Sequence, residues 1–181
     1  VVAAACKAAK YWFSRGGFNA KIINTEKIGQ IHFLFKGNLS NIEKVFSKNK
    51  SKLIISIKKL TKNMNKRGGG LKDLEIINKT DLIDNYYQLK ATFETADAMG
   101  ANFINSCLEK LAESFENFIK NDPVLSSNEK NIEIIMSVLS NYTPNCLVKA
   151  SVSCPINKLG PFKNMKSEEF VKKFLMAIKI A

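Results

Sequence analysis

The chain has 181 residues, of which 45% are hydrophobic, and its 28 basic and 16 acidic side chains give a net charge of +12. This hydrophobic share is sufficient for a packed core and excludes an intrinsically disordered chain. No apolar run reaches the length of a membrane span. The positive charge favours an anionic partner, either a nucleic acid or a small polyanion such as a dinucleotide.

The spacing of apolar residues predicts an alternation of helices and strands. In chain order these are a helix over 1–15, strands over 18–25 and 28–36, a helix from about 40 to 66, strands over 72–78 and 85–94, a helix over 97–120, strands over 131–140 and 145–153, and a helix over 167–180.

Turn-forming and capping residues set several of these boundaries. Glu26-Lys27 is expected to join the first two strands as a hairpin, and Gly29 is expected to form a β-bulge. Ser40 and Asn41 are expected to cap the second helix, and Ser167 the last one.

The order of elements from residue 28 is strand, helix, strand, strand, helix, strand, which is the split βαβ pattern of ferredoxin-like folds. We therefore predict an α+β fold with an antiparallel sheet that carries two helices on one face. The Gly-x-Gly-x-x-Gly fingerprint of Rossmann folds is absent from the sequence, which gives no support to that type of dinucleotide site.

The cysteines and the single histidine give no sign of catalysis or metal binding. Cys6, Cys107, Cys146 and Cys154 have neither zinc-finger nor redox spacing, and the simplest interpretation is buried free thiols in a reducing cytosol. His32 lies in a predicted strand and is expected to be structural. No metal site is predicted.

The most informative segment is Asp97-Ala98-Met99-Gly100-Ala101-Asn102, which leads into the long helix. At a helix N-terminus, free N–H groups and the positive end of the helix dipole can face an anion. A glycine there lets a phosphate approach the backbone closely. The alternative is that Asp97 caps the helix while the small residues pack under a sheet.

This segment, placed between a strand and a helix, resembles the nicotinamide-binding motif of 3-hydroxy-3-methylglutaryl-coenzyme A reductases, and the surrounding sequence resembles the bacterial, or second, class of that family. Four further segments occur in the family's order and roughly its spacing: Val1-Val2-Ala3-Ala4-Ala5, Arg15-Gly16-Gly17-Phe18, Gly68-Gly69-Gly70-Leu71-Lys72-Asp73 and Leu139-Ser140-Asn141. The resemblance therefore covers nearly the whole chain.

The resemblance implies a small, non-Rossmann nicotinamide-binding domain over 20–141, inserted into a larger domain to which 1–19 and 142–181 belong. It implies reduction of 3-hydroxy-3-methylglutaryl-coenzyme A to mevalonate with two NAD(P)H, a step of isoprenoid biosynthesis in the cytoplasm. The active site would lie at the subunit interface of a homodimer or higher oligomer. The family's catalytic Glu, Lys, Asp and His map outside this chain, which looks like a piece of a longer protein. We therefore assign no catalytic residue and expect the isolated chain to be inactive.

The resemblance also assigns cofactor-binding residues. The neighbours of the pyrophosphate and ribose would be Asp97, Ala98, Met99, Gly100 and Asn102. Asn141 resembles a residue near the nicotinamide and the substrate. Taken without the resemblance, Asn141 is equally well a turn residue ahead of Pro144.

One departure from the family pattern bears on the choice of cofactor. Members that prefer NADH place an aspartate about seven residues before the glycine triplet, where it binds the ribose 2′-hydroxyl. Here that position is Thr61, and the basic residues close by in the sequence are Lys58, Lys59, Lys62, Lys66 and Arg67. A carboxylate would repel a 2′-phosphate and lysines would attract one, so we predict NADPH as the preferred cofactor, with NADH as a second one. Alternatively, these lysines are simply the solvated face of a helix.

Two other functions are compatible with this fold. A basic ferredoxin-like RNA-binding module would need exposed aromatic residues on the central strands, for which Tyr86, Phe93 and Phe33 are the candidates. No RNA-binding strand motif is present, and neither a nucleic acid nor a membrane is predicted as the partner. A ligand-sensing regulatory domain is permitted by the fold, although no residue demands it.

Overall fold

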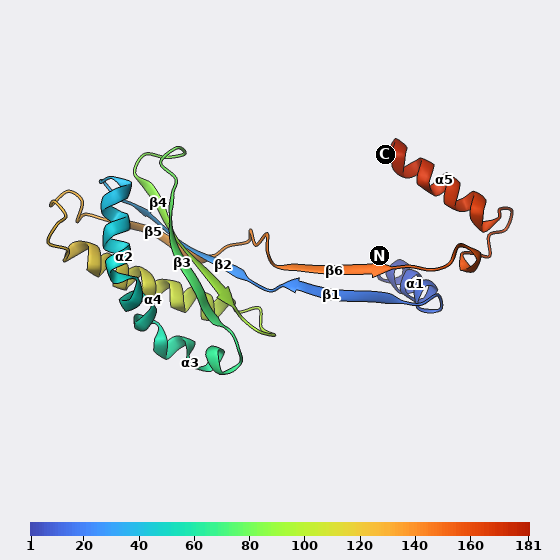
Figure 1. Ribbon diagram of the computed structural model, residues 1–181, viewed down its shortest axis with the longest axis horizontal. Coiled ribbons are helices and arrows are strands. Elements are labelled where there is room, and N and C mark those ends of the chain that lie inside the picture. Colours follow the sequence, from blue (N-terminus) through green and yellow to red (C-terminus); the bar gives the residue numbers. More distant parts are fainter. The chain divides into compact units, whose positions relative to one another are not determined.

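The computed structural model describes all 181 residues, Val1–Ala181 (Figure 1). The chain forms two compact units. One unit is the continuous segment Asn24–Leu147, and the other combines Val1–Ile23 with Val148–Ala181.

A four-stranded antiparallel sheet in the order β3-β4-β2-β5 forms the base of the Asn24–Leu147 unit. Its strands are β2 (Lys27–Leu34), β3 (Gly70–Asn78), β4 (Tyr86–Glu94) and β5 (Glu133–Leu139). The helices α2 (Leu39–Ser56) and α4 (Ala101–Lys120) follow β2 and β4 in the chain, and a short helix, α3 (Lys58–Lys66), precedes β3. The predicted ferredoxin-like α+β arrangement is confirmed by this strand order.

The core lies between the sheet and its helices. Alternate residues of the central strands, such as Ile31 and Phe33 on β2 and Leu89 and Phe93 on β4, are fully buried. The helices α2 and α4 contact the sheet and each other (Figure 1). Their inward stripes supply further core residues, among them Ile42, Val45, Leu53, Ile104, Leu108, Leu111 and Phe115. Because strands repeat every two residues and helices every 3.6, each element buries one side only.

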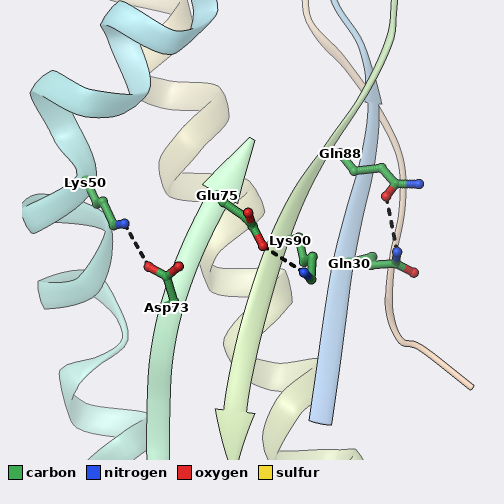
Figure 2. Close-up of polar contacts among 6 residues, drawn as sticks. All are labelled: Gln30, Lys50, Asp73, Glu75, Gln88 and Lys90. Carbon is green, nitrogen blue, oxygen red and sulfur yellow. Dashed lines mark hydrogen bonds and ion pairs between the residues drawn. The ribbon is translucent and has the colours of Figure 1, made fainter. Parts of the chain in front are cut away.

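Polar pairs occupy the other face of the sheet and one of its edges (Figure 2). Gln30 and Gln88 are joined by a 3.2 Å hydrogen bond between the central strands. Lys90 Nζ lies 2.7 Å from a carboxylate oxygen of Glu75 on β3. At the β3 edge, Lys50 of α2 pairs with Asp73 at 2.9 Å and holds the pKa of that carboxyl below its ordinary value. Both ion pairs are partly exposed, so each adds little to stability, whereas Gln88 is buried and its hydrogen bond to Gln30 satisfies a polar group shielded from water.

Gly29 does not form the predicted bulge. The strand pairing runs through Gly29 without a break on both sides, and the irregularity between β2 and β5 lies at His32/Phe33 instead. A Cβ at Gly29 would lie 2.7 Å from Leu108 Cδ1 and 3.1 Å from Ile104 Cγ2. The glycine is therefore needed because α4 packs closely over β2 at this point.

The predicted hairpin at Glu26-Lys27 is also wrong. Strand β1 (Phe18–Asn24) pairs with β6 (Leu147–Val152) in a separate two-stranded sheet. The side chain of Asn24 accepts the N–H of Glu26 at 2.9 Å, forming an Asx turn between β1 and β2. Because β2 is a central strand whose two edges are occupied by β4 and β5, it offers no edge to β1.

The caps of two helices differ from those predicted. Asn38 is the N-cap of α2, and its side-chain oxygen accepts the N–H of Asn41 at 2.9 Å. The predicted cap residues Ser40 and Asn41 are therefore already inside the first turn. Ser167 is the first residue of α5 (Ser167–Ile180) and donates its hydroxyl to the Leu159 carbonyl, so it does not cap the helix.

The Val1–Ile23 and Val148–Ala181 unit contains α1 (Val2–Phe13), the β1-β6 sheet, a short 3₁₀ helix (Ile156–Lys158) and α5. Arg15 connects the two segments of this unit. The Arg15 guanidinium stacks on the Tyr11 ring at 3.6 Å and its Nε donates to the Lys158 carbonyl at 2.8 Å. Neither α1 nor α5 has a buried residue. No helix of the chain combines the length and the hydropathy that a membrane crossing requires.

The prediction that the cysteines are buried holds only for Cys107. It lies on the inward stripe of α4, whereas Cys6 and Cys146 are exposed and Cys154 is half-buried. Burial raises the pKa of the Cys107 thiol to about 11. The exposed cysteines lie on a helix without buried residues and in a loop, where no core surrounds them.

This contrast predicts different thiol reactivities. At neutral pH a water-soluble disulfide reagent should label Cys6 and Cys146 quickly and leave Cys107 unmodified, because the thiolate is the reactive form and the Cys107 thiol is both buried and protonated. Mass spectrometry of labelled peptides identifies the sites, and the same reaction in denaturant, where all four cysteines should react, is the control. Native labelling of Cys107 at the rate of Cys146 would contradict the burial of Cys107 in the core.

Candidate functional site

The candidate site is built around the loop between β4 and α4, Thr95–Gly100. Thr95 is fully buried and forms the inside of this loop. Its hydroxyl donates to the Ala98 carbonyl at 2.6 Å, and its own carbonyl accepts the Ala98 N–H at 3.0 Å. Ala96 has a φ of +51°, an uncommon conformation for a residue with a side chain. The loop is therefore held in one shape by its own hydrogen bonds.

Gly100 is the N-cap of α4, and no side chain caps the helix. The alternative in which Asp97 serves as the cap is therefore wrong. Because the first N–H groups of a helix have no acceptor within it, the N–H groups at the start of α4 remain available to a ligand. The positive end of the helix dipole lies at the same place, and this combination favours a bound anion.

Only glycine suits position 100. Its φ is +82°, in the left-handed region. A Cβ at this position would also overlap the side-chain methyl group of Thr95. The glycine therefore lets the loop close over Thr95 immediately before α4 begins.

Asp97 forms an ion pair with Arg67, which follows α3 directly. Arg67 is the largest cause of a lowered pKa for the Asp97 carboxyl. The Asp97 side chain is 84% exposed, so the pair has little value for stability. The ion pair instead connects the 95–100 loop to the end of α3.

The remaining residues of the motif face solvent. Met99 is 73% exposed, and Asn102 lies exposed in the first turn of α4. Ala98 is half-buried. The five predicted motif residues thus lie together around the uncapped end of one helix, with accessible side chains beside free backbone groups.

Asn141 lies in an exposed turn that follows β5. The turn is held by the Ser140 hydroxyl, which accepts the Tyr142 N–H at 3.1 Å. The end of β5 is attached to the start of α4, because Asn105 accepts the Leu139 N–H at 2.9 Å. The turn therefore belongs to the same end of the sheet as the 95–100 loop.

Thr61 is only 5% exposed, and its hydroxyl donates to the Lys58 carbonyl within the helix. A ligand outside the protein therefore has no access to this hydroxyl in the structure. The exposed side of the same region is a groove lined by Ile55, Lys58, Lys59, Lys62, Asn65 and Lys66. The cationic surface that the sequence predicted is present, but lysines form it and Thr61 lies beneath them.

Sequence reasoning did not single out Arg67 as a partner of the motif. The two residues of the ion pair are 30 positions apart, and no short motif contains both. The signal available in the sequence was the position of Arg67 next to the glycine triplet, which ends α3 and starts β3.

Two of the three aromatic residues proposed for RNA binding are unavailable. Phe33 and Phe93 are fully buried, and Phe33 packs against Tyr87 and Phe115 in the core. Only Tyr86 lies on the sheet face away from the helices, where its hydroxyl is 2.6 Å from His32 Nδ1. Burial lowers the pKa of His32, and its pairing with Tyr86 fits a structural role.

The full length of the chain, residues 1–181, matches the family model described as hydroxymethylglutaryl-coenzyme A reductase. The chain belongs to this family. The resemblance seen in the motif at Asp97–Asn102 is thereby confirmed, and the five co-linear segments lie within the matched region.

Individual relatives agree with this assignment. The chain is 32% identical over 136 residues to a probable 3-hydroxy-3-methylglutaryl-coenzyme A reductase of Borreliella burgdorferi. The aligned region covers 75% of this chain and 28% of that protein. The fold is similar to a class II 3-hydroxy-3-methylglutaryl-CoA reductase from Streptococcus pneumoniae bound to NADPH in open conformations, with 27% identity and a TM-score of 0.75 over 99% of this chain and 45% of that one. A second structure of the Streptococcus pneumoniae enzyme has the same TM-score of 0.75 and is covered to 40%. The chain thus spans less than half the length of these reductases.

The geometry at Gly100 leads to a stability prediction. Gly100→Ala should lower the free energy of unfolding by about 2 kcal/mol, since it combines a strained φ with an overlap against Thr95. Gly68→Ala is a matched control, because Gly68 has a similar φ of +83° and nothing within 4 Å of a Cβ. It should cost only about 1 kcal/mol. Urea unfolding of both variants measures the difference, and equal losses would show that the Thr95 contact is unimportant.

Proposed function

We propose that this chain is the cofactor-binding part of a 3-hydroxy-3-methylglutaryl-coenzyme A reductase, an oxidoreductase that forms mevalonate with two NAD(P)H. The domain over 20–141 would hold the cofactor, and 1–19 and 142–181 would belong to the large domain. The observation that carries the proposal is the uncapped N-terminus of α4 behind Gly100, within a family match over the whole chain. Its chemistry suits the negatively charged pyrophosphate of a dinucleotide.

Each motif residue has a role in this proposal. The backbone N–H groups at the start of α4 would bind pyrophosphate oxygens, and Gly100 would allow their close approach. The exposed side chains of Met99 and Asn102 would contact the ribose and phosphate, with Ala98 leaving room for them. Asp97, positioned by Arg67, would accept a ribose hydroxyl.

We propose NADPH as the preferred cofactor and NADH as a weaker one. The groove on α3 carries four lysines and no carboxylate, so it favours the additional 2′-phosphate of NADPH. Thr61 is neutral and its side chain is buried, so it adds no negative charge that would repel the phosphate. The Streptococcus pneumoniae relative was solved with NADPH, which supports the same choice. Thr61→Asp is a poor test of this preference, because it would put a carboxylate in a buried position.

The rest of the reaction is proposed by analogy with the family. Asn141 would lie near the nicotinamide and the substrate. The thioester would be reduced in two hydride transfers, with an aldehyde stage between them. We propose 3-hydroxy-3-methylglutaryl-coenzyme A as substrate, a homodimer or higher oligomer as the working form, and the cytoplasm as the compartment. The catalytic acid and base groups are not assigned to this chain, and we expect it to be inactive alone.

A pair of charge variants tests the cofactor assignment. In a titration of the chain followed by nicotinamide fluorescence, Lys62→Gln with Lys66→Gln should weaken NADPH binding about tenfold and change NADH binding little. The reason is that only NADPH carries the 2′-phosphate that these lysines would attract. The matched control is Lys36→Gln with Lys79→Gln. It removes the same charge just after the C-terminal ends of β2 and β3, at the end of the sheet away from the candidate site.

Two results would contradict the proposal. Equal losses in the two double variants would mean that NADPH responds only to net charge. Tight, salt-sensitive binding of a short single-stranded RNA, with no response to either nucleotide, would favour the nucleic-acid module instead.

A further inference from the structure

Glu94 is the last residue of β4, and its carboxylate turns toward the backbone of the loop that follows. One carboxylate oxygen accepts the Ala96 N–H at 2.8 Å. The other accepts the Thr25 hydroxyl. Both carboxylate oxygens therefore accept hydrogen bonds. One bond holds the loop after β4, and the other holds the short segment before β2.

The hydrogen bond to the Ala96 N–H is made at a residue with an unfavourable backbone conformation. Ala96 has a φ of +51°, which costs free energy for any residue with a Cβ. A charged acceptor on its N–H offsets this cost, because hydrogen bonds to carboxylates are stronger than neutral ones. The Thr25 hydroxyl is the largest cause of the lowered pKa of Glu94, so the carboxylate is charged at neutral pH.

Thr95 supports the same loop from inside. Its hydroxyl bonds to the Ala98 carbonyl, and its methyl group fills the space beneath Gly100. Glu94 and Thr95 therefore act on both ends of the segment that precedes α4. The sequence motif itself contains neither residue.

We propose that Glu94 and Thr95 are positioning residues for the dinucleotide. They hold the 95–100 loop in the conformation that presents the free N–H groups of α4, and they act through the loop backbone. This inference rests on the proposed function, since it takes the α4 N-terminus as the dinucleotide site. Thr25 extends the set, because it anchors Glu94 from the segment that leads into β2.

Conservative variants separate positioning from charge. Glu94→Ala loses both hydrogen bonds, whereas Glu94→Gln keeps an oxygen for the Ala96 N–H and an amide for Thr25. We expect NADPH binding by the chain to weaken about tenfold in Glu94→Ala, because the loop must then be ordered on binding. It should weaken less in Glu94→Gln, because the hydrogen bond to the Ala96 N–H remains although it loses the strength that the charge adds. Glu75→Ala removes a carboxylate from the neighbouring strand and serves as the control.

Thr95 is tested with a second pair. Thr95→Val keeps the shape under Gly100 and loses the bond to the Ala98 carbonyl, whereas Thr95→Ser keeps the hydroxyl. We expect Thr95→Val to bind NADPH more weakly than Thr95→Ser. Hydrogen exchange of the ligand-free chain provides a readout that does not depend on NADPH. The Ala96 N–H should exchange faster in Glu94→Ala than in Glu94→Gln or in Glu75→Ala.

The outcomes distinguish this inference from the proposed function. If the wild-type chain fails to bind NADPH, the proposed function is overturned. The dinucleotide is then also ruled out as the ligand of this loop. If wild type binds NADPH and Glu94→Ala binds it equally well, only the positioning role is overturned. An Ala96 exchange rate that is the same in Glu94→Ala and Glu94→Gln would overturn it as well. Weaker binding together with faster exchange in Glu94→Ala alone supports it.

Discussion

The antiparallel pairing of β4 with β3 on one side and β2 on the other determines where the candidate residues lie. Gly70 pairs with Glu94, and Lys27 pairs with Phe93. The end of β4 therefore meets the beginnings of both neighbouring strands at one end of the sheet. Because all strands run antiparallel, β5 also ends there. The glycine triplet, the 95–100 loop and the turn at Asn141 are gathered by this single arrangement.

A common electrostatic feature links the groups gathered at this end. The uncapped start of α4 offers positive backbone groups, and the lysine groove on α3 offers positive side chains. Arg67 stands between them and pairs with Asp97 of the loop. These charges are exposed, so they add little to folding stability and remain available to an anion. The dinucleotide proposed as the ligand carries negative charge at more than one point along its length, which would match such a divided surface.

The rigidity of the site depends on residues of low accessibility. Thr95 is fully buried and Glu94 is bonded on both oxygens, so the loop is supported from inside and from β4. Gly29 has a comparable part in the fold, because it lets α4 pack closely on β2. The helix whose N-terminus forms the candidate site is thus fixed to the sheet by close contact and to the loop by hydrogen bonds. Preorganisation of this kind lowers the ordering cost of binding.

Local chemistry in the sequence accounts for the elements, the fold class and the motif. The apolar periods of β2, β4 and α4 are visible residue by residue, and their order identifies the split βαβ pattern. The pairing partners are not local. Two adjacent strands separated by Glu26-Lys27 satisfy the rules for a hairpin, yet β1 joins β6 because β2 has neighbours on both sides. Helix capping is not decided locally for a similar reason, since Asn38 and Ser40 are both capable caps and only the backbone path selects one.

By itself, therefore, the sequence determined that this is an α+β chain of the hydroxymethylglutaryl-coenzyme A reductase family with a glycine at the entrance of a long helix. These features depend on residue type and spacing along the chain. Only the tertiary structure decided that Thr61 lies beneath its lysines, that Arg67 meets Asp97, and that Glu94 holds Ala96. Burial and the pairing of distant side chains depend on how the elements pack, and short-range sequence patterns carry no record of that packing.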